Sequence, residues 1–306
     1  MTAPASVPPS GTSLSLRNLT VLVLLTIVWG FNWPAMKLAV VGFSPWQFRA
    51  ACAAFGIVAL FAIARLQGHR VMPPPGLWRS LCFAGILNVS GWQVFSASAL
   101  QYIPSGRAAI LAYTMPLMTA VLSVPLLGER LTMRIVAALV LGMAGMALLL
   151  PPGLLEAEDD QLLGILLMLG AALSWGLGTI YLKHLKLPLS TTVITAWQFV
   201  FALPPMFVGA LFEPWPDPAR LTWPVLLGAI YASTLAVAYG YWAWFRLVEV
   251  LPATIASIAT LATPVVGVLS GALVLGESVG WREGASLGAV LAALVLILYR
   301  KPVSKE

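Results

Sequence analysis

Residues 103–129 read IPSGRAAILAYTMPLMTAVLSVPLLGE, and residues 251–277 repeat the pattern as LPATIASIATLATPVVGVLSGALVLGE. Three landmarks recur in the two stretches at a constant separation of 148 residues: Pro104 with Pro252, Pro116 with Pro264, and Gly128-Glu129 with Gly276-Glu277. Proline and glycine can recur by chance in apolar sequence, but a constant separation over three landmarks favours a duplicated unit.

A shorter phrase marks an earlier point in each unit. Residues 26–39 read TIVWGFNWPAMKLA, and residues 172–185 read ALSWGLGTIYLKHL. The matching residues are separated by 146 positions: Trp29, Gly30 and Lys37 in the first copy, and Trp175, Gly176 and Lys183 in the second. The two phrases together divide the chain into two related halves.

The composition places the chain in a membrane. Hydrophobic residues make up 60% of the sequence, charged residues 9%, and the mean hydropathy is +0.92, whereas a soluble domain carries about 25% charged residues. The apolar runs are about 20 residues long, the length that an α-helix needs to cross roughly 30 Å of hydrocarbon. A transmembrane β-barrel would show alternating segments of about 10 residues, so we predict an all-α integral membrane protein.

Ten apolar segments are candidate transmembrane helices. They lie at residues 19–41, 46–66, 77–98, 105–127, 132–150, 161–185, 189–212, 222–247, 253–275 and 280–299. The predicted domains are a disordered cytoplasmic tail at 1–18, a first five-helix repeat at 19–150, a second five-helix repeat at 161–299 and a tail at 300–306.

The basic residues predict the orientation of these helices, because cytoplasmic loops of membrane proteins are enriched in Lys and Arg. With the N-terminus in the cytoplasm, twelve basic residues fall on the inner side: Arg17, Arg65, Arg70, Arg79, Arg130, Arg134, Lys183, Lys186, Arg246, Arg300, Lys301 and Lys305. Three fall on the outer side: Arg107, Arg220 and Arg282. Both termini are therefore expected in the cytoplasm. Since five is odd, the second repeat would be inverted, an arrangement found in many transporters.

The ten spans, the duplicated unit, the WG…K phrase and the P…P…GE phrase together resemble the EamA type of the drug/metabolite transporter superfamily, over nearly all of the chain after residue 18. The resemblance implies an exporter in the cytoplasmic (inner) membrane of a bacterium that works by alternating access. Amino acids, above all hydrophobic or aromatic ones, are the expected cargo. The alternatives are other amphipathic metabolites or drugs, and a non-transporting scaffold or receptor. A monomer and a homodimer both remain open.

Polar and aromatic side chains inside the predicted spans are candidates for the substrate pathway, since ligand sites combine apolar walls with a few polar groups. The candidate substrate-binding residues are Trp29, Asn32, Trp33, Asn88, Trp92, Gln93, Tyr113, Trp175, Tyr239, Trp242, Ser257 and Thr260. Such walls suit an amphipathic, neutral or zwitterionic metabolite. The expected partners are this small molecule and the lipid bilayer.

Three basic residues within or at the ends of spans are candidates for a gate or a charged contact: Lys37, Arg49 and Lys183. Lys37 could extend its ammonium to the membrane surface or bind a substrate carboxylate. Arg49 could close a gate through interhelical hydrogen bonds or contact the substrate.

Three prolines inside spans are expected to act as hinges: Pro34, Pro116 and Pro264. Proline lacks the N–H of a helical hydrogen bond and kinks a helix. The carbonyl that it frees must line a cavity or find another partner.

The acidic residues all fall in loops, tails or helix ends. Because proton-coupled transporters commonly carry a buried Asp, Glu or His, we expect facilitated diffusion. No zinc-binding HExxH and no P-loop is present. We therefore expect no enzyme activity, no catalytic residue, no metal site and no cofactor. The net charge of +6 is explained by the loops, so no nucleic-acid partner is expected.

Overall fold

The computed structural model describes most of the chain, and every regular element in the described part is helical. The described residues are 16–115, 118–119, 122, 125–126, 133–149, 159–185, 187–250 and 262–298. Over these residues the all-α prediction is confirmed.

The helices follow the same order in both halves of the chain. The first half contains α1 (Leu16–Gly42), α2 (Pro45–Leu66), α3 (Trp78–Ala84), η1 (Gly85–Gly91), α4 (Trp92–Tyr102), α5 (Ser105–Ala112) and α7 (Met133–Leu149). The second half contains α8 (Asp159–Leu185), α9 (Thr191–Leu211), the short 3-10 helix η2 (Pro218–Arg220), α10 (Trp223–Tyr231), η3 (Ala232–Tyr239), α11 (Gly240–Val250), α13 (Ala262–Leu275) and α14 (Trp281–Leu298). The first residues of α4 and α11 are 148 positions apart, as are those of α7 and α14. The spacing of the sequence repeat is therefore also the spacing of the helices.

Five helical stretches in the described part are long and apolar enough to cross a membrane. They are Leu16–Gly42, Pro45–Leu66, Asp160–Leu182, Thr191–Leu211 and Trp223–Trp244. They coincide with the first, second, sixth, seventh and eighth predicted spans. Two shorter apolar stretches, Val136–Gly145 and Thr263–Leu275, fall within the fifth and ninth predicted spans.

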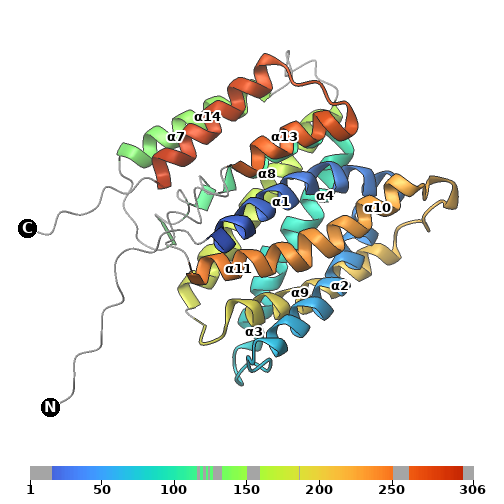
Figure 1. Cartoon of the computed structure of the whole chain (residues 1–306), viewed down its shortest axis with the longest axis vertical. Coiled ribbons are helices and arrows are strands. Elements are labelled where there is room, and N and C mark those ends of the chain that lie inside the picture. Colours follow the sequence, from blue (N-terminus) through green and yellow to red (C-terminus); the bar gives the residue numbers. More distant parts are fainter. Residues whose placement is uncertain are drawn as a thin grey trace, which may run out of the picture.

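The two halves interleave in one bundle (Figure 1). Helix α1 packs against α10, α11 and α13 of the second half, and α8 packs against η1, α4 and α5 of the first. Helix α2 lies against α9, and α7 lies against α14 at one edge of the bundle (Figure 1). The pairs α2–α9 and α7–α14 join equivalent elements of the two halves, while α1 and α8, which are equivalent to each other, each pack into the opposite half.

A π-helical segment interrupts the third span of each half. These segments are η1 and η3, and their first residues, Gly85 and Ala232, are 147 positions apart. In a π-helix the hydrogen bonds join residues five apart, and such segments are frequent at functional sites. The sequence analysis did not predict them.

Helix α1 runs through Pro34, whose missing N–H deprives the carbonyl of Gly30 of its helical partner. The hydroxyl of Ser270, on α13, donates a hydrogen bond of 3.2 Å to this carbonyl. Gly30 also lets the two helices approach closely, because a Cβ at this position would overlap the side chain of Val266. A side chain of α13 thus replaces the hydrogen-bond donor that Pro34 lacks. The hinge motion itself stays a prediction.

The predicted span at 105–127 is not one continuous helix. Helix α5 ends at Ala112, and Tyr113 and Thr114 form a turn. Pro116 lies outside the described residues, and the N–H of Met118 donates a hydrogen bond of 3.0 Å to the carbonyl of Thr114, so helical bonding resumes after the turn.

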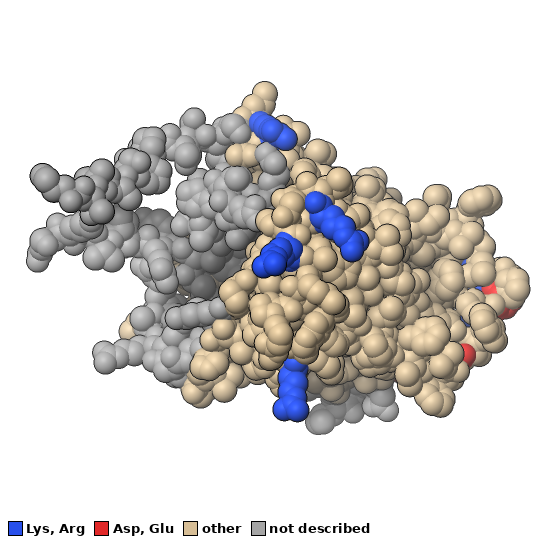
Figure 2. All heavy atoms as spheres, turned by 90° about the horizontal axis from the view of Figure 1, so that it is seen from below, with Lys and Arg blue, Asp and Glu red and all other residues tan. Residues whose placement is uncertain are grey.

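Basic and acidic side chains are distributed unequally along the bundle. In Figure 2 most Lys and Arg side chains lie over the middle and left of the visible face, and Asp and Glu lie at its right end. By their places at helix ends, Arg17, Arg65 and Arg79 lie at the end of the bundle where α1 begins. The carboxylates with described side chains lie toward the opposite end: Asp160, Glu213, Asp217, Glu277 and Glu283.

Candidate functional site

Arg49 is the one basic side chain in the described part of the chain that is fully buried, with 3% of its surface exposed. Its position follows from the start of α2. Ser44 and Gln47 form a capping box there, and Pro45 occupies the first helical position. This start places Arg49 about one turn inside the helix, where it faces α1 and α4.

The hydrogen-bond partners of Arg49 are all neutral. Its Nε donates to the carbonyl of Gln93 at 3.0 Å. One Nη donates to the hydroxyl of Ser96 at 3.2 Å and to the thioether sulfur of Met36 at 2.8 Å. The ring of Phe48 lies 4.8 Å from the guanidinium carbon. No carboxylate among the described side chains lies within 4.0 Å of this cation.

Asn32 extends this group of polar contacts on α1. Its Nδ2 donates to the sulfur of Met36 at 3.2 Å, as expected for side chains four residues apart on one helix face. Its Oδ1 is buried and accepts no hydrogen bond from the described residues. We call Asn32, Met36, Arg49, Gln93 and Ser96 the interior cluster.

A second group of predicted residues lies between α1 and α11. The indole of Trp29 donates a hydrogen bond of 3.1 Å to the carbonyl of Ala236, in η3, and packs against Trp244 at 5.9 Å. Tyr239 packs against Trp242, with ring centroids 5.7 Å apart. The hydroxyl of Tyr239 is buried and without a partner among the described residues.

A third group lies between α4 and α8. Trp92 and Trp175 meet edge to face, with ring centroids 5.3 Å apart. Asn88 is buried in η1 beside Gly178, and its Oδ1 has no partner among the described residues. Next to it, the hydroxyl of Ser174 donates a hydrogen bond of 2.6 Å to the carbonyl of Leu87.

The second and third groups show how the π-helical segments are held. A side chain of α1, Trp29, binds a carbonyl of η3, and a side chain of α8, Ser174, binds a carbonyl of η1. Helices α1 and α8 are equivalent elements, and so are the two segments. Each half therefore supplies a side-chain donor to the π-helical segment of the other half.

Two predicted residues lie in the hydrophobic core. Trp33 is 5% exposed and Tyr113 is 7% exposed, and both belong to the largest buried cluster of the bundle. Their aromatic rings therefore pack between helices. The predicted pathway residues thus fall into several separate groups in this structure. Gln93 belongs to the interior cluster, where its backbone carbonyl accepts a hydrogen bond from Arg49.

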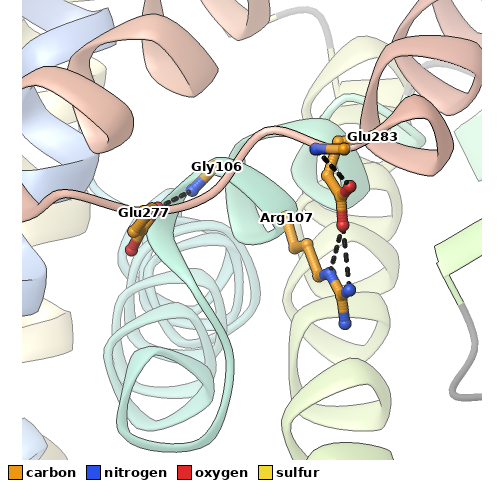
Figure 3. Close-up of polar contacts among 5 residues, drawn as sticks. Gly106, Arg107, Glu277 and Glu283 are labelled. Carbon is orange, nitrogen blue, oxygen red and sulfur yellow. Dashed lines mark hydrogen bonds and ion pairs between the residues drawn. The ribbon is translucent and has the colours of Figure 1, made fainter.

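One end of the bundle carries a set of charged contacts (Figure 3). The carboxylate of Glu277 accepts hydrogen bonds from the backbone N–H groups of Ser105 and Gly106, at 2.6 and 2.9 Å, and from the Ser105 hydroxyl at 2.9 Å. Helix α5 begins after Pro104 without a side-chain cap of its own. A residue of the second half therefore caps this helix of the first half.

The Gly-Glu phrase has a physical meaning at this place. Gly276 ends α13 in the left-handed conformation, with a φ of +67°, and its N–H donates to Ala272 O at 3.1 Å. The chain then turns, which brings the next residue, Glu277, to the start of α5.

Two further contacts join helices at this end. Arg107 forms an ion pair with Glu283, with 2.8 Å between Nη2 and Oε1 (Figure 3). Lys37 donates a hydrogen bond of 2.8 Å to the carbonyl of Ile103 at the end of α4. Its positive charge also interacts favourably with the negative end of the helix dipole there. We call Lys37, Ser105, Gly106, Arg107, Glu277 and Glu283 the end cluster.

Several predicted residues cannot be placed. Ser257, Thr260 and Pro116 lie outside the described residues, as does the side chain of Lys183, whose backbone is part of α8. Pro264 is buried in the first turn of α13, which begins at Ala262 in the described part of the chain.

A groove of about 510 Å³ lies elsewhere, between the last turns of α2 and the first turns of α9. It is lined by Ile57, Val58, Phe61, Ala62, Arg65, Val71, Met72 and Trp197. None of the predicted substrate-binding residues belongs to it.

Sequence reasoning missed most partners of Arg49 and the roles of the end cluster. Ser96 and Met36 carry no sequence signal, because they meet Arg49 only after α1, α2 and α4 pack together. Glu277 did carry a signal, since it belongs to the repeated Gly-Glu phrase, but the phrase by itself does not indicate which helix the carboxylate contacts.

The comparisons with known proteins agree with this architecture. The chain is 25% identical over 276 residues to "Uncharacterized transporter YoaV" of Bacillus subtilis, covering 90% of this chain and 92% of that protein. It is 26% identical over 292 residues to "Probable amino-acid metabolite efflux pump" of Escherichia coli, covering 91% and 93%. A solved crystal structure has the same fold, with a TM-score of 0.65 at 20% identity, covering 92% of this chain and 96% of the other.

The model of the EamA-like transporter family matches both halves, at residues 17–150 and 162–299. One matched segment lies in each half of the chain, so the family model covers two repeats. The chain is therefore a multi-pass membrane protein that belongs to the EamA-like transporter family.

Proposed function

We propose that this protein is a carrier in the cytoplasmic membrane that exports amino acids, above all hydrophobic or aromatic ones, by alternating access. Its ten transmembrane helices form two five-helix repeats inserted in opposite orientations, and both termini lie in the cytoplasm.

The observation that carries this proposal is that each half donates a side-chain hydrogen bond to the π-helical segment of the other half. Trp29 of α1 binds η3, and Ser174 of α8 binds η1. In carriers built from inverted repeats, each half can take the conformation of the other, and the substrate site lies between them. A structure in which equivalent helices hold equivalent irregular segments of the opposite half suits such an exchange.

The orientation is supported by the distribution of charge. Arg17, Arg65 and Arg79 lie at one end of the bundle and the described carboxylates lie toward the other, which fits a cytoplasmic end rich in Lys and Arg. With that orientation the end cluster faces outward. Its contacts between α1, α5, α13 and α14 would close the outer side, and they would have to break in the outward-open state.

The cargo is inferred from two observations. The interior holds aromatic side chains beside buried amides and one guanidinium, which suits a small amphipathic molecule with a charged group. One relative is named a probable amino-acid metabolite efflux pump. The carboxylates with described side chains lie in loops or in first turns of helices, so facilitated diffusion is the proposed mechanism.

Uptake of a radiolabelled amino-acid panel into liposomes that contain the purified protein tests this function. We expect saturable uptake of one class, blocked by its unlabelled members, with protein-free liposomes as the blank. Replacing Trp175, which meets Trp92 inside the bundle, by Ala should lower the rate. Trp281→Ala is the matched control, because this side chain is 74% exposed.

Three results would argue against parts of the proposal. A proton current stoichiometric with substrate would exclude simple facilitated diffusion. Uptake of drugs or other metabolites but no amino acid would change the cargo. A folded protein that moves none of these compounds would favour a scaffold or receptor.

A further inference from the structure

We infer that Arg49 and Asn32 form a carboxylate-binding subsite, so that the carrier selects hydrophobic monocarboxylates, and the amino group of an amino acid is dispensable. This inference rests on the proposed transport function and specifies which part of the substrate is recognised.

Two donors on different helices converge on one atom in the interior cluster. An Nη of Arg49, on α2, and Nδ2 of Asn32, on α1, both point at the sulfur of Met36, at 2.8 and 3.2 Å. A thioether sulfur is a weak acceptor. The site thus directs a charged donor and an amide donor at a position that now holds a poor partner for both.

A carboxylate at this position would be a much better acceptor. It has two oxygens, and a guanidinium bonds to it through charge-assisted, often bidentate hydrogen bonds. Met36 can give way, because methionine is unbranched and has three rotatable side-chain bonds. Its sulfur would then act as a placeholder that leaves when the substrate enters.

The charge of the site favours the same ligand. Arg49 is 3% exposed, and its described hydrogen-bond partners are a carbonyl, a hydroxyl, a thioether and the thiol of Cys52. A buried charge is costly unless an opposite charge accompanies it, and an ionisable residue inside a membrane bundle often marks a substrate path. A substrate carboxylate would supply the missing counter-charge during its passage.

The ammonium of an amino acid finds less at this site. The carboxylates with described side chains lie in loops or first helical turns, away from the interior cluster. The buried oxygen of Asn32, which has no described partner, offers one neutral acceptor. An amino group can therefore be accommodated, but it contributes less to binding than the carboxylate.

Four related compounds separate the two ends of the substrate. Proteoliposomes with the full chain would be tested for uptake of labelled L-phenylalanine, with phenylpyruvate, phenylalaninamide and phenethylamine as competitors. We expect phenylpyruvate to compete within about tenfold of phenylalanine, and the two compounds without a carboxylate to be about 10- to 100-fold weaker. Equal competition by phenethylamine would overturn the subsite.

Variants assign the selectivity to the named residues. Arg49→Gln should bring the amide and the acid to similar potency, and Arg49→Lys should recover part of the preference because it keeps the charge without the planar fork. Asn32→Asp should shift the preference toward phenethylamine, since it places an anion beside Arg49. Arg79→Gln, at an exposed inner position, is the matched control and should leave the ratio unchanged.

Met36→Leu distinguishes a placeholder from a structural partner. If the sulfur only occupies the site, this nearly isosteric change leaves the preference for carboxylates intact. Loss of the preference in Met36→Leu, or its retention in Arg49→Gln, contradicts the inference. The ratio of acid to amide potency is the readout, because a variant that merely folds less well lowers both potencies together.

Failure of the inference can be told apart from failure of the transport function. Stabilisation of the purified protein against heat by phenylpyruvate, but not by phenethylamine, reports the subsite without transport. Uptake of phenylalanine with no preference for carboxylates leaves the carrier standing and removes the subsite. If none of the four compounds is taken up and none stabilises the protein, both the subsite and the transport function are rejected.

Discussion

Arg49 and Arg107 carry the same type of side chain in two different surroundings. Arg107, in the end cluster, forms an ion pair with Glu283, whose side chain is 12% exposed. Arg49, in the interior cluster, has only neutral partners among the described residues. The bundle thus pairs its charges where helices from the two halves are tied together at one end. It leaves a charge without a counter-charge in the interior, where we place the substrate.

The largest effect should come from removing the interior charge. Arg49→Met replaces the guanidinium by an apolar chain of similar length. We expect transport to fall about 100-fold, while the free energy of unfolding changes by less than about 1 kcal/mol, because no buried counter-charge is left unpaired. Initial uptake rates and SDS-induced unfolding in micelles measure the two quantities. A loss of several kcal/mol would instead make Arg49 a structural residue.

Glu277 should show the opposite behaviour. Glu277→Ala removes the acceptor of three hydrogen bonds at the start of α5, so we expect unfolding to become easier by about 2–3 kcal/mol. Glu277→Gln should recover part of this, since its amide oxygen still accepts. The control is Glu213→Ala, in the α9–α10 connection, and equal losses for Glu213 and Glu277 would argue against the cap.

The contact between α1 and α13 depends on packing rather than charge. A Cβ at Gly30 would overlap the Val266 side chain, so Gly30→Ala should destabilise the protein by about 1–3 kcal/mol. Gly284→Ala, where a Cβ meets nothing within 4 Å, should be neutral or slightly stabilising. The same unfolding measurement decides, and equal behaviour of the two variants would mean that the helices can separate without cost.

The smallest effect is expected from the ion pair of the end cluster. A double-mutant cycle with Arg107→Ala and Glu283→Ala should give a coupling of about 0.3–1 kcal/mol, because partly exposed pairs are screened by solvent. Added salt should lower the coupling further. A salt-independent coupling well above this range would mean that the pair is effectively buried and contributes more to closure than we expect.

Much of the architecture could be predicted from the sequence. The landmarks Pro104 and Pro252 define a repeat of 148 residues, and α4 and α11 keep that spacing. The helical class and the division into halves followed from the length and position of apolar runs. Pro116 indicated an irregularity in the span at 105–127, but the end of α5 at Ala112 was not predicted, because apolar composition does not show where a helix is interrupted.

The candidate site was only partly predictable. Asn32 and Arg49 stood out as polar residues in apolar segments, but their common neighbour Met36 has an ordinary membrane side chain. The π-helical segments η1 and η3 were missed as well. A π-helix differs from an α-helix in which backbone groups pair, and no particular residue type is required for that change.

The sequence by itself determined that this chain is helical, belongs in a membrane and was built by duplication, because these properties depend on composition and on the spacing of residues along the sequence. Tertiary structure alone decided which charge is paired and which is not. Glu277 reaches α5 and Arg49 reaches the sulfur of Met36 only after helices of distant sequence pack together. Burial then removes the water that would otherwise make such differences small.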